Sequence, residues 1–202
     1  MTLTQLVWLT GPRASGKSTI AKAFERELYC VDLDCLLTRL NERVPKEYRY
    51  DDWQDWQGFK RMRAEQPEAF RHHLQTAWTS FSGTAKDVLA VGWHAKEDWI
   101  RAVIKQDALD NRNPKEHFLL IIQRVEKIQE NIKRRDRKRD HPFEEVKYCC
   151  DEGKKLLIDS VARFERLSLG GEWLRLDDAA HALRRIASLT GVTEPPPPVD
   201  WE

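Results

Sequence analysis

Residues 11–19 read GPRASGKST, and most of what the sequence predicts about its fold follows from this stretch. The glycines at its first and sixth positions let backbone N–H groups turn inward with no side chain in the way, which makes a cradle for phosphate oxygens. An apolar run at residues 6–9 precedes it, and residues 17–27 place apolar side chains on one face of a helix. The pattern of strand, glycine-rich loop and helix is the P-loop that binds nucleoside triphosphates.

The residues of this P-loop have expected tasks. The Lys17 ammonium should reach the β- and γ-phosphates, and the Ser18 hydroxyl should bind Mg²⁺. The helix that begins near Lys17 adds the positive end of its dipole. ATP and Mg²⁺ are therefore the predicted cofactors. The nucleotide-binding residues are expected to be Gly11, Arg13, Ala14, Ser15, Gly16, Lys17, Ser18 and Thr19.

Four further apolar runs alternate with helical patterns along the chain. The runs lie at residues 29–33, 88–91, 118–122 and 173–176, and helices are expected at 17–27, 35–43, 67–81, 94–109, 124–139, 143–167 and 178–189. Such alternation predicts an α/β fold of three layers, in which a five-stranded parallel sheet has helices on both faces. Residues 46–66 show no clear period. The predicted domain spans residues 1–190 and is followed by a proline-rich tail at 191–202.

Composition limits the class of protein. With 202 residues, the chain has the length of one α/β domain. Charged residues make up 33% of it, and no window approaches the roughly 18 uninterrupted apolar residues of a membrane span. The N-terminal apolar run has no basic stretch before it and leads into the P-loop, so we expect a cytoplasmic protein without a secretory signal. The net charge of +1 does not indicate an acidic partner, and the oligomeric state is left open.

Acidic residues end the second predicted strand. Asp32 and Asp34 alternate on an extended segment, so both carboxylates should point the same way, at the sheet edge where ligands bind in such folds. The pair can hold Mg²⁺ or its bound water, and Asp34 can accept a proton from an attacking hydroxyl. Asp34 can also cap the following helix, and the two roles are compatible.

Other P-loop machines carry features that this sequence lacks. The NKxD guanine motif of GTPases does not occur. Motor and transporter ATPases usually place a carboxylate after an apolar strand, whereas the run at residues 88–91 continues into Gly92, Trp93 and His94. These absences favour a kinase.

A basic segment follows the fourth predicted strand. Between Arg124 and Asp140, eight Lys and Arg residues stand against four Asp and Glu. Arg135 and Arg139 lie one helical turn apart within the sequence RDRKR, so they can clamp a transferring γ-phosphoryl group. A solvated charged helix face would have the same composition.

The P-loop, the aspartate pair and the R-D-x-x-R segment followed by HPFEEV resemble the small P-loop kinases, in particular polynucleotide and shikimate kinases. In that family the aspartates lie between metal and acceptor, and an R-N-x-x-R lid precedes a loop that contains proline. The resemblance implies a kinase with a lid at residues 124–142. The implied catalytic residues are Lys17, Asp34, Arg135 and Arg139, and the implied metal ligands are Ser18, Asp32 and Asp34.

The acceptor side is expected in residues 41–81 and at the end of the third strand. Polynucleotide kinases carry an arginine three residues after the catalytic aspartate, but Leu37 stands there, and Arg39 is the candidate substitute. The other acceptor-binding candidates are Asp34, Trp93 and His94, of which His94 can instead cap the next helix. Within the insertion, aromatic and basic residues interleave, which suits stacked bases and phosphates or, equally, a small irregular core. These residues are Tyr48, Tyr50, Trp53 and Trp56 with Arg43, Lys46, Arg49 and Lys60.

The predicted acceptor is a hydroxyl of a nucleotide or nucleic acid, such as a polynucleotide 5′-hydroxyl or a hydroxymethylated DNA base. A small metabolite or a nucleoside monophosphate is the alternative acceptor. A regulatory or nucleic-acid-binding P-loop ATPase, with water as its only acceptor, is the alternative of another class.

Overall fold

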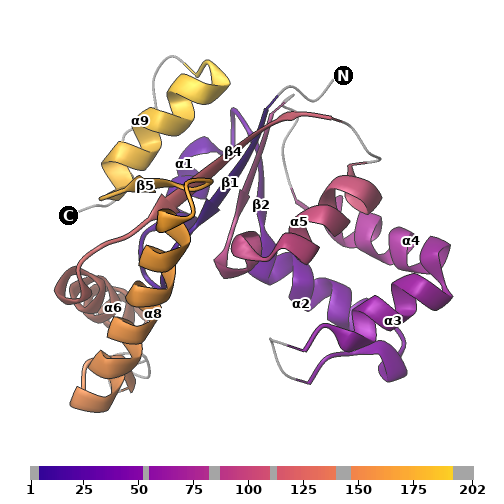
Figure 1. The fold of residues 1–202 in the computed structure, drawn as a ribbon, viewed down its shortest axis with the longest axis horizontal. Helices are drawn as coiled ribbons and strands as arrows, with labels where there is room; N and C mark the ends of the chain where they lie inside the picture. Colours follow the sequence, from indigo (N-terminus) through magenta and orange to yellow (C-terminus); the bar gives the residue numbers. More distant parts are fainter. Residues whose placement is uncertain (1–4, 52–54, 82–86, 110–112, 140–146, 193–202) are drawn as a thin grey trace.

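A single parallel sheet forms the centre of the computed structural model, which describes residues 5–51, 55–81, 87–109, 113–139 and 147–192, the last three of 113–139 as backbone only (Figure 1). Its strands lie in the order β2-β3-β1-β4-β5. They are β1 (Gln5–Thr10), β2 (Tyr29–Asp32), β3 (Val88–Val91), β4 (Lys115–Ile121) and β5 (Leu174–Leu176). The five-stranded parallel sheet of the predicted α/β fold is confirmed.

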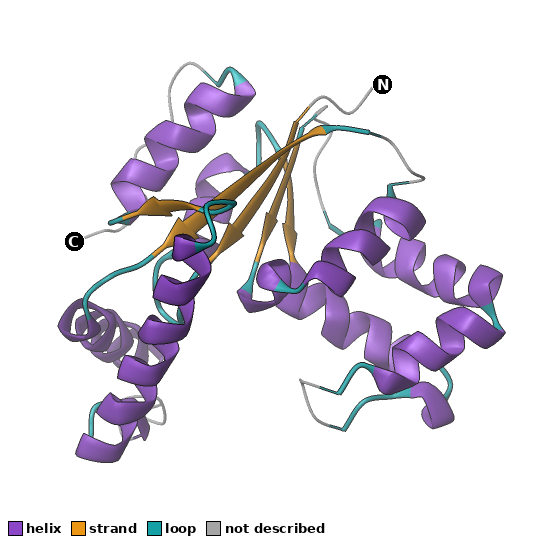
Figure 2. Ribbon diagram, in the orientation of Figure 1, coloured by secondary structure: helices purple, strands orange, loops and turns teal. Residues whose placement is uncertain are grey.

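Helices cover both faces of this sheet (Figure 2). On one face, α1 (Lys17–Phe24) and α9 (Ala179–Thr190) pack against Val7 and Leu9. On the other, α2 (Leu33–Arg43), α5 (Asp98–Val103) and α8 (Asp151–Leu169) share a core with Leu6 and Trp8. Because neighbouring side chains of a strand point to opposite faces, β1 belongs to both cores and is buried from Leu6 onward.

The segment between α2 and β3 folds into a helical insertion beside the sheet. It contains a short 3₁₀ turn (Lys46–Tyr48), α3 (Gln57–Glu65) and α4 (Pro67–Trp78). The prediction of an aperiodic segment at 46–66 is wrong for α3, whose buried face consists of only Phe59 and Met62. Two apolar positions are too few to produce a visible helical period. Pro67 occupies the first turn of α4, as expected.

Two predicted helices are interrupted. The one expected at 94–109 consists of a 3₁₀ turn (Trp93–Lys96), α5 and a π-helical turn (Ile104–Ala108). The one expected at 143–167 is helical at Lys147 and Tyr148, bends at the next two residues and resumes as α8. A Cβ on Gly153 would come within 2.0 Å of the Lys147 carbonyl oxygen, so this bend requires glycine.

The predicted lid helix is present as α6 (Val125–Arg139). Residues 140–142 of the predicted lid segment lie outside the described residues, as does the tail from residue 193. In Figure 1, α6 and the N-terminal part of α8 lie beyond the carboxyl ends of the strands on one side, and the insertion lies on the other side of the molecule. No helix in the described ranges is both long and apolar enough to cross a membrane.

Candidate active site

The P-loop connects β1 to α1 in a conformation that depends on left-handed backbone. Ala14 has φ 55° and Gly16, at the N-cap of α1, has φ 93°. Left-handed residues of this kind turn successive N–H groups toward one side and create an anion-binding nest. At Gly11 a Cβ would meet the Ile121 carbonyl oxygen at 2.5 Å, so the end of β4 leaves no room for a side chain. The first glycine of the motif is therefore needed for packing as well as for phosphate access.

Lys17 folds back over the loop. Its Nζ donates to the carbonyl oxygens of Gly11 (3.0 Å) and Pro12 (2.8 Å). Burial lowers the pKa of Lys17 to about 8, while the negative charges of Asp34 and Asp32 oppose this change. The amine is thus still mostly protonated at neutral pH, and the charge that would meet a phosphate is in place.

Asp32 ends β2 and caps α2. Its Oδ1 accepts hydrogen bonds from the backbone N–H groups of Asp34 (3.0 Å) and Cys35 (3.1 Å). The expected capping role of Asp34 is therefore wrong, because α2 begins at Leu33, two residues earlier than predicted. Burial raises the pKa of Asp32, which the two N–H donors oppose. Asp32 and Ser18 line the same open pocket of about 280 Å³, so two of the three predicted metal ligands face one space, whereas Asp34 does not line it.

Asp34 lies in the first turn of α2 and reaches across to the end of β3. Its Oδ2 accepts from the Trp93 N–H (3.2 Å) and its Oδ1 from the His94 N–H (3.4 Å). The side chain is 43% exposed, so one side of the carboxylate stays open. A Cβ on Gly92 would lie 3.0 Å from Asp34 Oδ1, so glycine at this position lets the Asp34 carboxylate approach the turn. The ends of β2 and β3 thus meet at Asp34.

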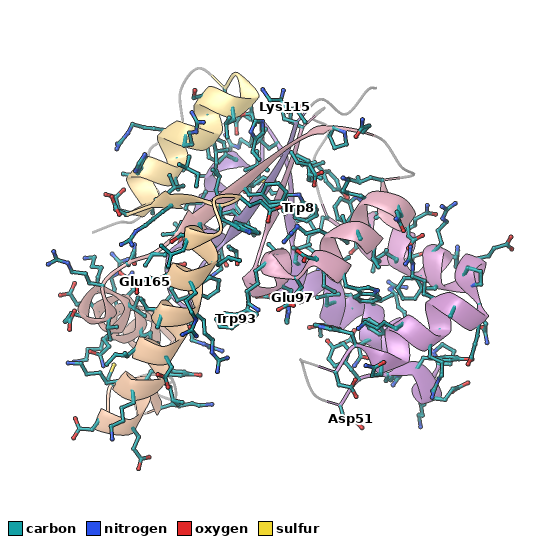
Figure 3. All side chains as sticks on the ribbon, in the orientation of Figure 1. Trp8, Asp51, Trp93, Glu97, Lys115 and Glu165 are labelled. Atoms are coloured by element: carbon teal, nitrogen blue, oxygen red, sulfur yellow. The ribbon has the colours of Figure 1, made fainter. Side chains whose placement is uncertain are left out.

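Trp93 and His94 differ in exposure. The His94 ring is buried and lies perpendicular to the Trp56 ring (ring centroids 4.9 Å apart), and its Nε2 is 4.0 Å from Asp34 Oδ1. Burial lowers the pKa of His94, although Asp34 opposes the shift. Trp93 is partly exposed and contacts Phe164 of α8. In Figure 3, Trp93 lies just beyond the strand ends, on the side of α8. No side chain caps α5, so His94 does not do so.

Helix α6, the predicted lid, contacts the P-loop through Asn131. The positive charge of Arg135, a half-buried residue, contributes to lowering the pKa of Lys17, so the two cations are near each other. The side chain of Arg139 lies outside the described residues. Asn131 Nδ2 donates to the Ala14 carbonyl oxygen (2.9 Å), a contact that sequence reasoning missed. The sequence signal for this contact is that Asn131 is a polar residue next to Ile132, which belongs to the buried face of α6.

The insertion presents fewer aromatic surfaces than expected. Tyr48, Tyr50 and Trp56 are at most 9% exposed and belong to the main core, where Tyr50 and Trp56 pack around Phe59. For these three residues the core interpretation applies, and Trp53 lies outside the described residues. Packing, rather than base stacking, therefore accounts for their presence.

Arg39 of α2 contacts the residues that end the insertion. Its guanidinium donates to Ser80 Oγ and sits 4.7 Å from the centre of the Phe81 ring. Ser80 and Phe81 also line the pocket shared by Ser18 and Asp32. Leu37 is 2% exposed, so an arginine at that position would be buried.

Comparison with known proteins gives one family match. Residues 3–42 match the model of the adenylylsulphate kinase family, a family of P-loop kinases. This segment holds Lys17, Ser18, Asp32 and Asp34, and the match supports the resemblance to small P-loop kinases over this part of the chain. No curated protein matches the sequence.

Several solved structures align along nearly the whole chain. The Deinococcus radiodurans tunicamycin resistance protein is 17% identical and aligns over 96% of this chain and 100% of its own, with a TM-score of 0.49. A sugar kinase from Janibacter is 16% identical over 94% and 96%, with a TM-score of 0.48. An Acinetobacter baumannii shikimate kinase in complex with shikimate is 17% identical over 95% and 96%, with a TM-score of 0.45.

Proposed function

We propose that this chain is a kinase that transfers the γ-phosphate of Mg-ATP to a hydroxyl acceptor. The observation that carries the proposal is the placement of Asp34. Its carboxylate is fixed by the N–H groups of Trp93 and His94, is open on one side and is close enough to Lys17 to affect the pKa of that lysine. A phosphate cradle and a carboxylate that can act as a base thus face each other.

Mg²⁺ fits the oxygen ligands at this place. The described residues contain no cluster of three or more His, Cys, Asp or Glu side chains that would bind a metal by themselves. Mg²⁺ instead is usually held by one or two carboxylates together with phosphate oxygens and waters. Ser18 and Asp32, which line one pocket, are the protein ligands we propose. Bound Mg²⁺ would neutralise charge on the β- and γ-phosphates.

The protein groups then have separate roles. The acceptor oxygen forms a bond to the γ-phosphorus, the bond from that phosphorus to the β,γ-bridging oxygen breaks, and ADP leaves. Asp34 takes the proton of the acceptor hydroxyl. The N–H groups of Trp93 and His94 hold the Asp34 carboxylate in place for this role. Lys17 and Arg135 offset the negative charge of the transferring group.

We keep a nucleotide or nucleic-acid hydroxyl as the first acceptor to test, and a small metabolite as the alternative. Support for a nucleic-acid acceptor comes from the segment with Arg135 and Arg139 alone, because the described aromatic residues of the insertion are buried. Arg39 and Trp93, both partly exposed, are the proposed acceptor contacts. In this proposal the buried His94 does not contact the acceptor, and its Nε2, 4.0 Å from Asp34 Oδ1, helps to position the carboxylate.

Transfer of radiolabelled γ-phosphate tests the proposal. Purified protein is incubated with labelled ATP, Mg²⁺ and a panel of nucleosides, nucleotides, 5′-hydroxyl oligonucleotides, hydroxymethylated DNA, sugars and small alcohols. Label in an acceptor, lost in Asp34→Asn, is the expected result. Release of free phosphate alone across the whole panel would contradict the kinase assignment and favour the ATPase.

A further inference from the structure

The lid helix and the P-loop are joined by a specific polar contact. Asn131 Nδ2 donates to the Ala14 carbonyl oxygen at 2.9 Å and lies 3.2 Å from Gln123 Oε1. Gln123, which follows β4, is 7% exposed. Ile128 and Ile132, on either side of Asn131, are fully buried in a small core that Ala14 also contacts. The packing of α6 therefore fixes where the Asn131 amide points.

The backbone at Ala14 needs such support. Ala14 is the one non-glycine residue with positive φ in the described ranges. A Cβ disfavours the left-handed conformation, because it comes too close to backbone atoms. If Ala14 left this conformation, the peptide groups on both sides of it would rotate. The N–H groups of Ala14 and Ser15, which belong to the phosphate cradle, would then point elsewhere.

We propose that Asn131 is a positioning residue for the nucleotide site, which holds the Ala14 carbonyl and so keeps the phosphate cradle formed. This inference rests on the proposed use of the P-loop for Mg-ATP. Asn131 and Arg135 are four residues apart, on the same side of α6. The contact to Ala14 therefore also sets the register in which α6 brings Arg135 toward Lys17.

Binding of Mg-ATP, measured by isothermal titration calorimetry, tests this role. In Asn131→Leu, which removes the donor but keeps an apolar side chain of similar size, we expect the Kd to rise about three- to tenfold, as loss of one neutral hydrogen bond predicts. Adding Ala14→Gly to that variant should restore the Kd to within about twofold of wild type, because glycine adopts positive φ without a steric cost.

A matched control is available on the same helix. Glu130→Gln removes the exposed pair of Glu130 with Lys127 (3.1 Å), which faces solvent next to Asn131. We expect this variant to bind Mg-ATP like wild type. If Asn131→Leu does not fold, as judged by circular dichroism, Asn131→Ala removes the amide without adding apolar volume.

Three results would overturn the inference. An unchanged Kd in a folded Asn131 variant would mean that the contact does not position the loop. A raised Kd that Ala14→Gly does not restore would mean that Asn131 acts by another route. If the wild-type protein itself does not bind Mg-ATP, the proposed function fails as well. If the wild-type protein binds Mg-ATP tightly and Asn131→Leu has the same Kd, only this inference fails.

Discussion

Replacement of Asp34 by asparagine should remove most phosphoryl transfer while Mg-ATP still binds. General-base catalysis contributes about 10²- to 10⁴-fold to a rate, so we expect kcat to fall by at least about 100-fold. Asparagine keeps one carbonyl oxygen, so only one of the bonds from Trp93 (3.2 Å) and His94 (3.4 Å) can persist. The lost bond should cost about 1 kcal/mol of stability, and less where water reaches the half-exposed side chain.

The assay separates chemistry from binding. Single-turnover rapid quench with an acceptor from the panel measures transfer, and calorimetry measures the Kd for Mg-ATP. Asp34 raises the pKa of Lys17, so its loss should lower that pKa below about 8. Measurements at about pH 6.5 keep Lys17 protonated in both proteins. Asp159→Asn, an exposed carboxylate of α8, is the matched control. Transfer within tenfold of wild type in Asp34→Asn would refute the assigned role.

Three further predictions concern Lys17, Gly92 and Phe59. If the Lys17 ammonium binds phosphate as proposed, its pKa of about 8 should rise when an anion is bound, so Mg-ATP affinity should be full below that pH and fall about tenfold per pH unit above it. Titration calorimetry across pH checks this, and Lys17→Ala should bind weakly with no such pH dependence. Gly92→Ala places a Cβ 3.0 Å from Asp34 Oδ1, and the resulting misplacement of the base should reduce kcat on the order of 100-fold in quench assays, with an unchanged Kd for Mg-ATP. Phe59→Ala removes a fully buried ring of the insertion and should lower the free energy of unfolding in urea by about 3–5 kcal/mol, and a loss under 1 kcal/mol would contradict its place in the core.

Features that depend on local sequence could be predicted from it. The run at residues 88–91 is buried on both faces as β3, and a continuous apolar run is what such a strand requires. The P-loop is recognisable because glycine is sterically required at fixed positions of the motif, as at Gly11, where the Ile121 carbonyl oxygen leaves no room for a Cβ. Both signals lie within a few residues of the structure they specify.

Other features depend on contacts that the sequence does not display. Helix α2 begins two residues earlier than predicted because Asp32, rather than Asp34, is its N-cap. Either aspartate satisfies the same local capping pattern. Aromatic residues interleaved with cations fit both a binding groove and a core, and only burial distinguishes the two at Tyr50 and Trp56. The contact from Asn131 to Ala14 joins residues 117 positions apart, so no local pattern announces it.

The contact of Trp56 with His94 limits how this protein could acquire a new acceptor. Trp56 comes from the insertion, and the ring it touches adjoins the carboxylate of Asp34. An insertion exchanged as a whole would bring a different surface to His94, and would so disturb Asp34, the proposed base, together with the proposed acceptor contacts. Recombination at residue 41 and residue 81 should therefore yield inactive chimaeras unless the incoming segment supplies an aromatic ring at the place of Trp56.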